Sequence, residues 1–188
     1  MAWSKTKQQL ESFICPSLVG RVEYRATSYR YAHDKSGRCH ITVDKKEVFN
    51  MCDSKYGIKW YQTVQEIKKE GQVLIPVSEE ELEAVRKMKV PEEAVLKVAR
   101  NRKMSDLAEL IIKEQGILSK TDFLKEANTF LTSSIESSLE SDHILPNIFA
   151  LIDRRVGKKK LRMLKDEMGL KHPIVQYFYK LRCEADNI

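Results

Sequence analysis

Apolar and polar residues alternate with a period of two in the first part of the chain. From Arg21 to Ala32 one side of an extended chain is apolar or small and the other is polar. The first side carries Val22, Tyr24, Ala26 and Ser28. This period predicts a half-buried strand, because successive side chains of a strand point to opposite faces. The pattern resumes from Arg38 to Met51, where Asp44-Lys45-Lys46 interrupts it and predicts a hairpin.

The length of the hairpin turn decides which residues of the two strands share a face. A two-residue turn at Lys45-Lys46 places the apolar residues of the two strands on opposite faces. A three-residue turn over 44–46 places all of them on one face, namely Cys39, Ile41, Val43, Phe49 and Met51. Because this second arrangement buries more apolar area, we predict the three-residue turn. With the turn at Asp34–Gly37, the result is a three-stranded antiparallel meander.

Helical spacing surrounds this predicted sheet. Residues 5–14 predict a short helix that Pro16 ends. Residues 58–69 repeat apolar positions at helical intervals and predict a helix that covers one face of the sheet. Residues 72–75 are a candidate for a short fourth strand.

The hydrophobic period changes to 3.6 near Ser78, and helix start and stop signals follow. Ser78-Glu79-Glu80-Glu81 and Ser119-x-x-Asp122 predict capped helix starts, and Pro91 suits a first helical residue. Ser105-Asp106 predicts the start of a separate helix that Gly116 closes. Pro173 predicts the start of the last helix.

The two periods together predict an α+β protein. Residues 1–77 are expected to form an N-terminal antiparallel sheet of three or four strands with a covering helix. Residues 78–188 are expected to form an all-helical part of antiparallel helices joined by short connections. The apolar residues expected to meet in the core of the last helices are Leu151, Ile152, Leu161, Leu164, Phe178 and Leu181.

Composition indicates a globular cytoplasmic protein. Apolar residues make up 42% of the chain, charged residues 32%, and the net charge is +6. No apolar run reaches the ~18 residues of a membrane-spanning helix, and the first residues lack a secretory signal pattern. The four cysteines are scattered without a CxxC pair, which indicates free thiols and no zinc site. No motif for another metal or an organic cofactor is present, so none is predicted.

The densest charge lies near the C-terminal end. Seven of the twelve residues from 154 to 165 are basic and none is acidic. A turn into a helix is predicted here, and free backbone amides among cations favour anions. We therefore take as candidate residues for binding nucleic acid or an acidic protein Arg154, Arg155, Lys158, Lys159, Lys160 and Arg162. In the alternative, Arg154 and Arg155 cap the preceding helix or pair with Glu136, Glu140 or Asp153.

Two other interpretations concern the predicted sheet. Glu23, Asp44 and Lys46 fit the carboxylates and lysine of a metal-dependent nuclease, although a hairpin turn at Asp44-Lys45-Lys46 explains the flanking pattern better. A second possible nucleic-acid surface has residues that contact phosphates or stack bases on one strand face. Its members are Arg21, Arg25, Tyr29 and Tyr31. A solvated sheet face explains the same pattern.

Several segments carry a resemblance to other proteins. They are Met1–Ser4, Gly20–Tyr31, Ala150–Leu161, His172–Val175 and Tyr179–Ala185. Together they resemble an uncharacterised family of small hypothetical bacterial proteins, over most of the chain. The resemblance implies no function.

The sequence thus leaves two classes of function open. The first is a non-enzymatic cytoplasmic binding protein that engages nucleic acid or an acidic protein through the basic residues 154–162. The second is an enzyme whose active site the sequence does not reveal, with a metal-dependent nuclease around Glu23, Asp44 and Lys46 as its leading form. No membrane partner is expected.

Overall fold

The computed structural model describes residues 3–33, 35–71 and 75–188. These form two compact units by internal packing. Unit 1 contains Met1–Ser54 together with Leu118–Ile188, and unit 2 contains Lys55–Ile117. The subdomain boundary predicted at residues 77 and 78 stays a prediction; it marks the change of hydrophobic period, and it lies within unit 2.

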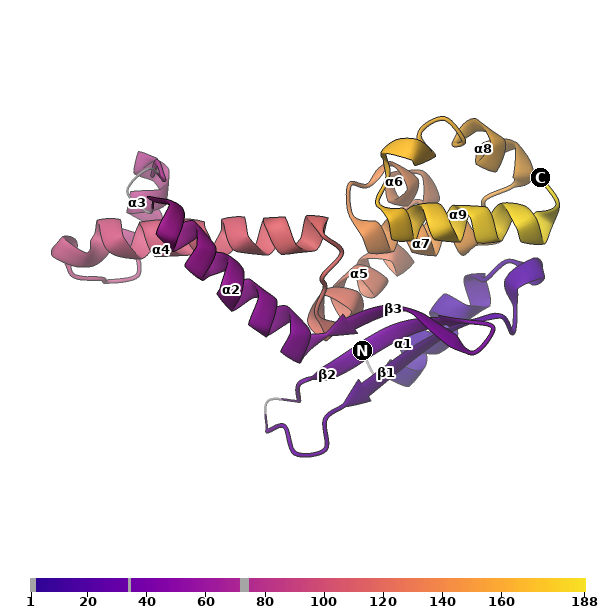
Figure 1. The fold of residues 1–188 in the computed structure, drawn as a ribbon, viewed down its shortest axis with the longest axis horizontal. Coiled ribbons are helices and arrows are strands. Elements are labelled where there is room, and N and C mark those ends of the chain that lie inside the picture. The colour runs from indigo at the N-terminus through magenta and orange to yellow at the C-terminus, as the bar shows by residue number, and fades with distance from the viewer. Residues whose placement is uncertain (1–2, 34, 72–74) are drawn as a thin grey trace. The chain divides into compact units, whose positions relative to one another are not determined.

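The predicted α+β class is confirmed (Figure 1). The first segment of unit 1 contains α1 (Trp3–Phe13), η1 (Pro16–Leu18), β1 (Val22–Ser28), β2 (Gly37–Val43) and β3 (Lys46–Cys52). Its second segment contains α5 (Lys120–Thr132), α6 (Ile135–Glu140), α7 (Ile144–Ile152), α8 (Lys158–Met163), η3 (Met168–Leu170) and α9 (Pro173–Asp186). Between these two segments the chain forms α2 (Asp53–Gly71), α3 (Glu79–Arg86) and α4 (Glu92–Glu114).

The three strands form the predicted antiparallel meander, in the order β1-β2-β3. Val22 pairs with Val43 and Ser28 with Gly37, so β1 and β2 are matched along their whole length. The apolar residues expected on one face of the hairpin are all buried, which confirms the predicted face. Asp34, from the predicted turn between β1 and β2, and 72–74, from the candidate fourth strand, lie outside the described residues.

The predicted three-residue turn of the hairpin is wrong, although its consequence for the faces is right. Val43 pairs with Lys46, so the turn has only Asp44 and Lys45, and both have positive φ. A shift of register between Ile41 and Thr42 then inserts one extra residue into β3. This β-bulge restores the parity that buries all the apolar side chains together, and the tight turn matches the right-handed twist of the strands.

The apolar face of the sheet packs against helices of its own unit. Tyr24 of β1 is buried, with its ring centroid 6.2 Å from that of Phe123 in α5 and 5.7 Å from that of Phe149 in α7. The core also includes Leu10 of α1. The covering helix predicted at 58–69 forms within α2, but all of these residues belong to unit 2. Within unit 1, α1, α5 and α7 provide apolar partners of the sheet, and the place of the helix at 58–69 over the sheet stays a prediction.

Most of the predicted helix starts are confirmed. Ser78 and Ser119 each form a full capping box at the starts of α3 and α5, and His172 caps α9. The separate helix predicted at Ser105 is wrong, because α4 continues through it. The Ser105 hydroxyl donates to the carbonyl of Asn101 one turn earlier, which lets serine stay inside a helix.

The predicted C-terminal core is confirmed. All six of its residues are buried in the core of unit 1, which α7, α8 and α9 share with the sheet. Cys15, Cys39 and Cys183 have free thiols, as expected. Cys39 lies on the core face of β2, where burial raises the pKa of its thiol to about 12. Among the described residues no helix is both long and apolar enough to cross a membrane.

Candidate functional site

The basic segment lies where the chain passes from α7 into α8. Asp153 is the C-cap of α7 and Gly157 is the N-cap of α8, so the first cations stand in the turn between the two helices. Val156 and Leu161 are buried and hold the turn and the start of α8 against the core. The charged residues are therefore fixed to a packed frame at their backbone.

Asp153 and Arg155 form a local ion pair beneath this turn. The buried Asp153 carboxylate accepts hydrogen bonds from the Arg155 backbone amide at 2.7 Å and from its Nη2 at 2.7 Å. The Arg155 guanidinium carbon also lies 4.3 Å from the ring centroid of Phe13. The hydrogen bonds to Asp153 raise the pKa of Arg155 above its ordinary value. The intramolecular alternative thus holds for Arg155, while its part in binding a partner stays a prediction.

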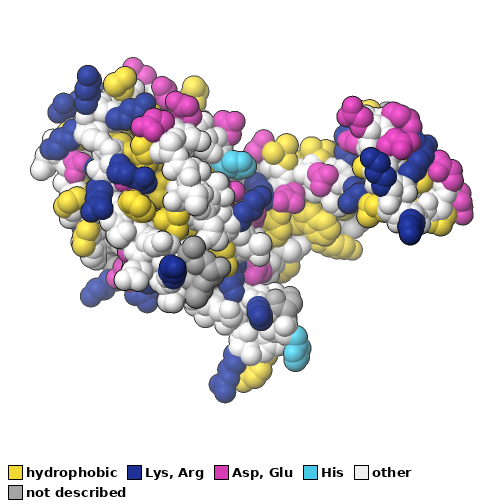
Figure 2. Space-filling model, turned by 180° about the vertical axis from the view of Figure 1, so that it is seen from behind, with side chains coloured by type: hydrophobic (Ala, Val, Ile, Leu, Met, Phe, Trp, Pro, Cys, Tyr) yellow, Lys and Arg dark blue, Asp and Glu magenta, His cyan; other side chains and the backbone are white. Residues whose placement is uncertain are grey.

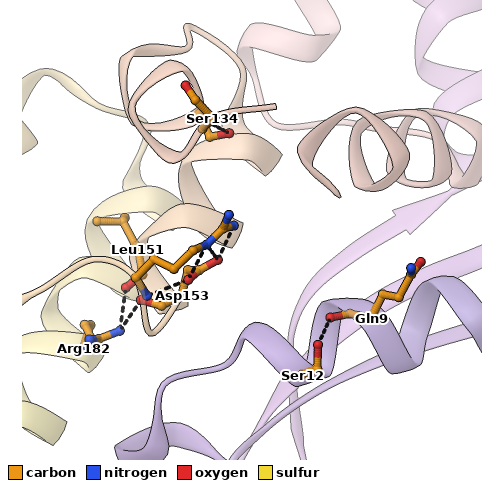
Figure 3. A network of polar contacts seen from close by, with 8 residues as sticks. Gln9, Ser12, Ser134, Leu151, Asp153 and Arg182 are labelled. Carbon is orange, nitrogen blue, oxygen red and sulfur yellow. Dashed lines mark hydrogen bonds and ion pairs between the residues drawn. The ribbon is translucent and has the colours of Figure 1, made fainter. Parts of the chain in front are cut away.

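Arg182 holds the same turn from inside the core. Its guanidinium donates to the backbone carbonyls of Leu151 at 3.3 Å, Asp153 at 3.0 Å and Val156 at 2.9 Å; Figure 3 shows the first two contacts. These include carbonyls at the end of α7 that have no partner within the helix. The buried arginine thus supplies the cation that favours a helix C-terminus.

Asp186 compensates the buried charge of Arg182. Its carboxylate accepts from Arg182 Nε at 2.8 Å and from the Ser17 hydroxyl at 2.6 Å. Burial raises the pKa of Asp186, but these hydrogen bonds outweigh it, so the pKa lies below its ordinary value. Sequence reasoning missed both residues. The available signal was Arg182 directly after the apolar Leu181, in the last helix.

The end of α1 anchors the turn from a third side. Phe13 accepts a hydrogen bond from the Arg154 amide at 2.8 Å, and Cys15 donates to the Ile152 carbonyl at 2.9 Å. Ile14 and Asp153 thereby form an isolated antiparallel bridge. The backbone of the basic turn is held by α1, α7 and α9 together.

The other candidate cations are less engaged. Lys158 Nζ donates to the Asp186 carbonyl at 2.6 Å, which caps the end of α9. Within the described ranges, the side chains of Arg154, Lys159, Lys160 and Arg162 make no hydrogen bond or ion pair. Lys160 is half-buried and the other three are exposed. Figure 2 shows Lys and Arg side chains at the end of unit 1 that carries α8, interspersed with apolar and acidic ones.

The aromatic and basic residues predicted to form one sheet surface lie apart. Arg21 precedes β1 and Tyr29 follows it, so they stand at opposite ends of the strand. Arg21 is engaged by Asp44 through two hydrogen bonds of 3.0 and 2.9 Å. The Tyr29 hydroxyl lies 3.0 Å from Cys52 Sγ, whereas Tyr31 is 85% exposed. These contacts favour a solvated face with Tyr29 packed at its end.

The residues of the nuclease interpretation are occupied by local contacts. Asp44 is a turn residue with φ of 48° and is held by Arg21, while Glu23 pairs with Arg25 at 2.7 Å. In the part of the chain that the structure describes, no three His, Cys, Asp or Glu residues are grouped as metal ligands. The nuclease stays a prediction, and the geometry of Asp44 is that of a hairpin turn.

The chain belongs to the SF0329 protein family, an uncharacterised family whose model matches residues 2–183. The resemblance seen in the sequence is thereby confirmed over nearly the whole chain. No curated protein and no solved structure matches it.

Proposed function

We propose that this member of the SF0329 protein family is a non-enzymatic, cytoplasmic binding protein that engages an acidic partner. The basic surface that we assign to this role consists of Arg154, Arg155, Lys158, Lys159, Lys160 and Arg162. One observation carries the proposal: four of these six side chains have no acidic or hydrogen-bonding partner among the described residues. The chain thus holds unneutralised positive charge on a fixed frame.

Electrostatics explains why such a surface favours an anion. Lys159 and Lys160 are neighbours at the start of α8, and Arg162 follows within the same helix. Like charges at this spacing raise the local potential, and an anionic partner relieves their repulsion. Because the backbone of the turn is already anchored by Phe13, Ile152 and Arg182, binding need not order the backbone, and its conformational cost is limited to the side chains.

The two partner classes differ in their response to salt. A nucleic acid releases condensed counterions, so its affinity falls linearly with the logarithm of salt concentration, by about one unit of slope per phosphate contact. An acidic protein shows a weaker dependence, since its carboxylates do not carry a condensed ion atmosphere. A pull-down from host lysate with and without nuclease treatment separates the two classes.

The direct test replaces Lys159, Lys160 and Arg162 by glutamine together. The matched control replaces three exposed lysines elsewhere, Lys55, Lys97 and Lys125, so that the loss of net charge is equal. We expect the first variant to bind the captured partner at least tenfold more weakly and the control to bind within about threefold of the wild type. For nucleic acid, the salt slope of the first variant should also flatten by about one unit per lost contact.

Both variants should keep the melting temperature of the wild type, because the replaced side chains are not buried in the core. The proposal is wrong if the control loses as much affinity as the first variant, since net charge alone would then explain binding. It is also wrong if the wild type captures neither nucleic acid nor an acidic protein.

A further inference from the structure

The outer face of the sheet, opposite the core, carries a compact set of polar residues. Across the strands, Arg25 pairs with His40, and His40 pairs with Asn50. On either side of this row lie Glu23, Thr42, Glu47, Thr27, Arg38 and Cys52. His40 is therefore the centre of the face, with a charged residue in each neighbouring row.

Two residues of this face are buried. His40 is 8% exposed and Thr42 is 5% exposed. In the described chain, His40 Nδ1 and Thr42 Oγ1 have no hydrogen-bond partner, and the same holds for Asn50 Oδ1. A buried polar atom without a partner costs about 1–3 kcal/mol, so most such atoms in native proteins are satisfied. Of these three residues, His40 also lines the hollow described below, so its Nδ1 is the atom that bears on a ligand there.

The two arginines of the face use only part of their hydrogen-bonding capacity within the protein. Arg25 donates one hydrogen bond to Glu23 at 2.7 Å, and Arg38 donates one to Glu47 at 3.3 Å. A guanidinium has five N–H donors and no acceptor. By contrast, Arg155 uses both its Nε and Nη2 on Asp153. Because both side chains are partly exposed, their remaining donors are accessible to a ligand group that only accepts hydrogen bonds.

A hollow opens over these residues. Its volume is about 570 Å³, and it is lined by Arg25, Arg38 and His40, by the carboxylate residue Glu23 that pairs with Arg25, and by Trp3 and Lys7 of α1. The hollow is wide open to solvent, so a ligand there would be held by polar contacts and not by enclosure. Lys7 adds a third cation at the rim, and it pairs with Glu11. Trp3 adds an apolar wall.

We propose that this hollow binds the phosphate group of a small phosphorylated molecule, held by Arg25 and Arg38 above His40. A phosphate presents three or more acceptor oxygens, and the planar fork of arginine matches them two at a time. The hollow is larger than one phosphate, so an organic portion lies against Trp3. This site is separate from the basic surface of α8 and stands without the proposed function.

His40 suits this role in its protonation. Burial lowers its pKa; Glu47 opposes this and raises it, and Arg38 and Arg25 lower it further. The imidazole is therefore neutral near pH 7 without ligand. A phosphate dianion placed between the arginines offsets their charge and attracts a proton to His40. Ligand binding should thus raise the pKa of His40 and give Nδ1 a proton to donate.

The test measures binding of inorganic phosphate and adenosine 5′-monophosphate to the full chain by calorimetry, with adenosine as the uncharged control. Titration of His40 is followed by NMR in the same samples. We expect saturable binding of both phosphate compounds, none of adenosine, and a rise in the pKa of His40 on binding. Arg25→Gln and Arg38→Gln should each weaken binding at least tenfold.

The matched control is Arg21→Gln, because Arg21 also flanks β1 but is engaged by Asp44. It should bind as the wild type does, as should the triple variant of Lys159, Lys160 and Arg162. If neither phosphate compound binds at millimolar concentration, or Arg21→Gln weakens binding as much as Arg38→Gln, the assignment is wrong. Binding of inorganic phosphate alone would identify a free anion as the ligand and overturn the organic portion. Loss of binding in the triple variant would overturn the separation of the two sites.

Discussion

Gly37, at the first position of β2, shows how closely two backbones meet. A Cβ atom added there would lie 2.0 Å from the Thr27 carbonyl oxygen and 2.8 Å from the Ser28 Cα. Both are backbone atoms, so neither can move away without breaking the pairing of β1 with β2. The Gly37 amide also donates to Asp53 at 2.8 Å. Position 37 therefore has no room for a side chain, and glycine is required there.

We predict that Gly37→Ala destabilises the protein by about 3 kcal/mol or more, since overpacking against backbone cannot relax. The matched change Gly57→Ala in α2 meets nothing within 4 Å. It should stabilise by about 0.5–1 kcal/mol, because alanine favours the helix over glycine. Chemical denaturation of both variants measures this. Equal loss of stability in the two would contradict the role given to Gly37.

At the same scale, the sequence did not reveal the residues that hold the basic turn. Arg182 is buried and donates to three carbonyls, yet arginine in a helix ordinarily predicts a solvated position. His40 likewise has no partner at a recognisable spacing. Its neighbours Arg25 and Asn50 come from other strands, and only the strand register brings them together. Long-range contacts of this kind leave no local signal.

At the scale of elements, period and capping signals predicted most of the fold. The two capping boxes at Ser78 and Ser119 were recognisable because their donors and acceptors lie three residues apart. The hairpin turn was not, because a bulge in β3 changes the parity that a turn length implies. Likewise, Ser105 carries a start signal, but its side chain bonds back to Asn101 inside α4. A local signal thus fails where a second arrangement, such as a bulge in a strand or a hydrogen bond inside a helix, satisfies the same polar groups.

The turn between α7 and α8 gives a prediction at this scale. Arg155→Ala removes the side chain that pairs with the buried Asp153 and packs on Phe13. We expect a loss of about 1–3 kcal/mol, the cost of leaving a buried carboxylate short of donors. Arg154→Ala, next to it, removes an exposed side chain and should change stability by less than about 0.5 kcal/mol.

Thermal or urea unfolding of the two variants gives the comparison. If Arg155→Ala is as stable as Arg154→Ala, then Arg155 does not hold the turn. It would then belong with Arg154 among the free cations of the basic surface.

At the scale of the whole molecule, unit 1 is built from two separate stretches of sequence. Core residues from both stretches meet in it, as Tyr24 does with Phe149. Hydrophobic period cannot predict this arrangement, because it reports the local element and not its partners. The change of period near Ser78 was therefore visible in the sequence, while the grouping of Met1–Ser54 with Leu118–Ile188 was not.

The chain leaves unit 1 after Ser54 and returns to it at Leu118, and these two points lie close together. The Cys52 amide donates to the Leu118 carbonyl at 3.1 Å. Asp53 then joins both stretches, since its carboxylate accepts from the amides of Gly37 and Lys120 at 2.8 Å each. A short connection can therefore span Ser54 to Leu118 without strain, and the cost of closing a short flexible loop is small.

We predict that a chain in which a short Gly-Ser linker replaces residues 55–117 folds into unit 1 by itself. The core of unit 1 is drawn entirely from the two remaining stretches, and its basic turn is held by Phe13, Arg182 and Asp186 of the same unit. The shortened chain should unfold cooperatively, with dispersed NMR signals for Tyr24 and Phe149. It should also keep the binding properties assigned to the basic surface and to the hollow over His40. A shortened chain that lacks a cooperative transition would show that unit 1 depends on residues 55–117 for its stability.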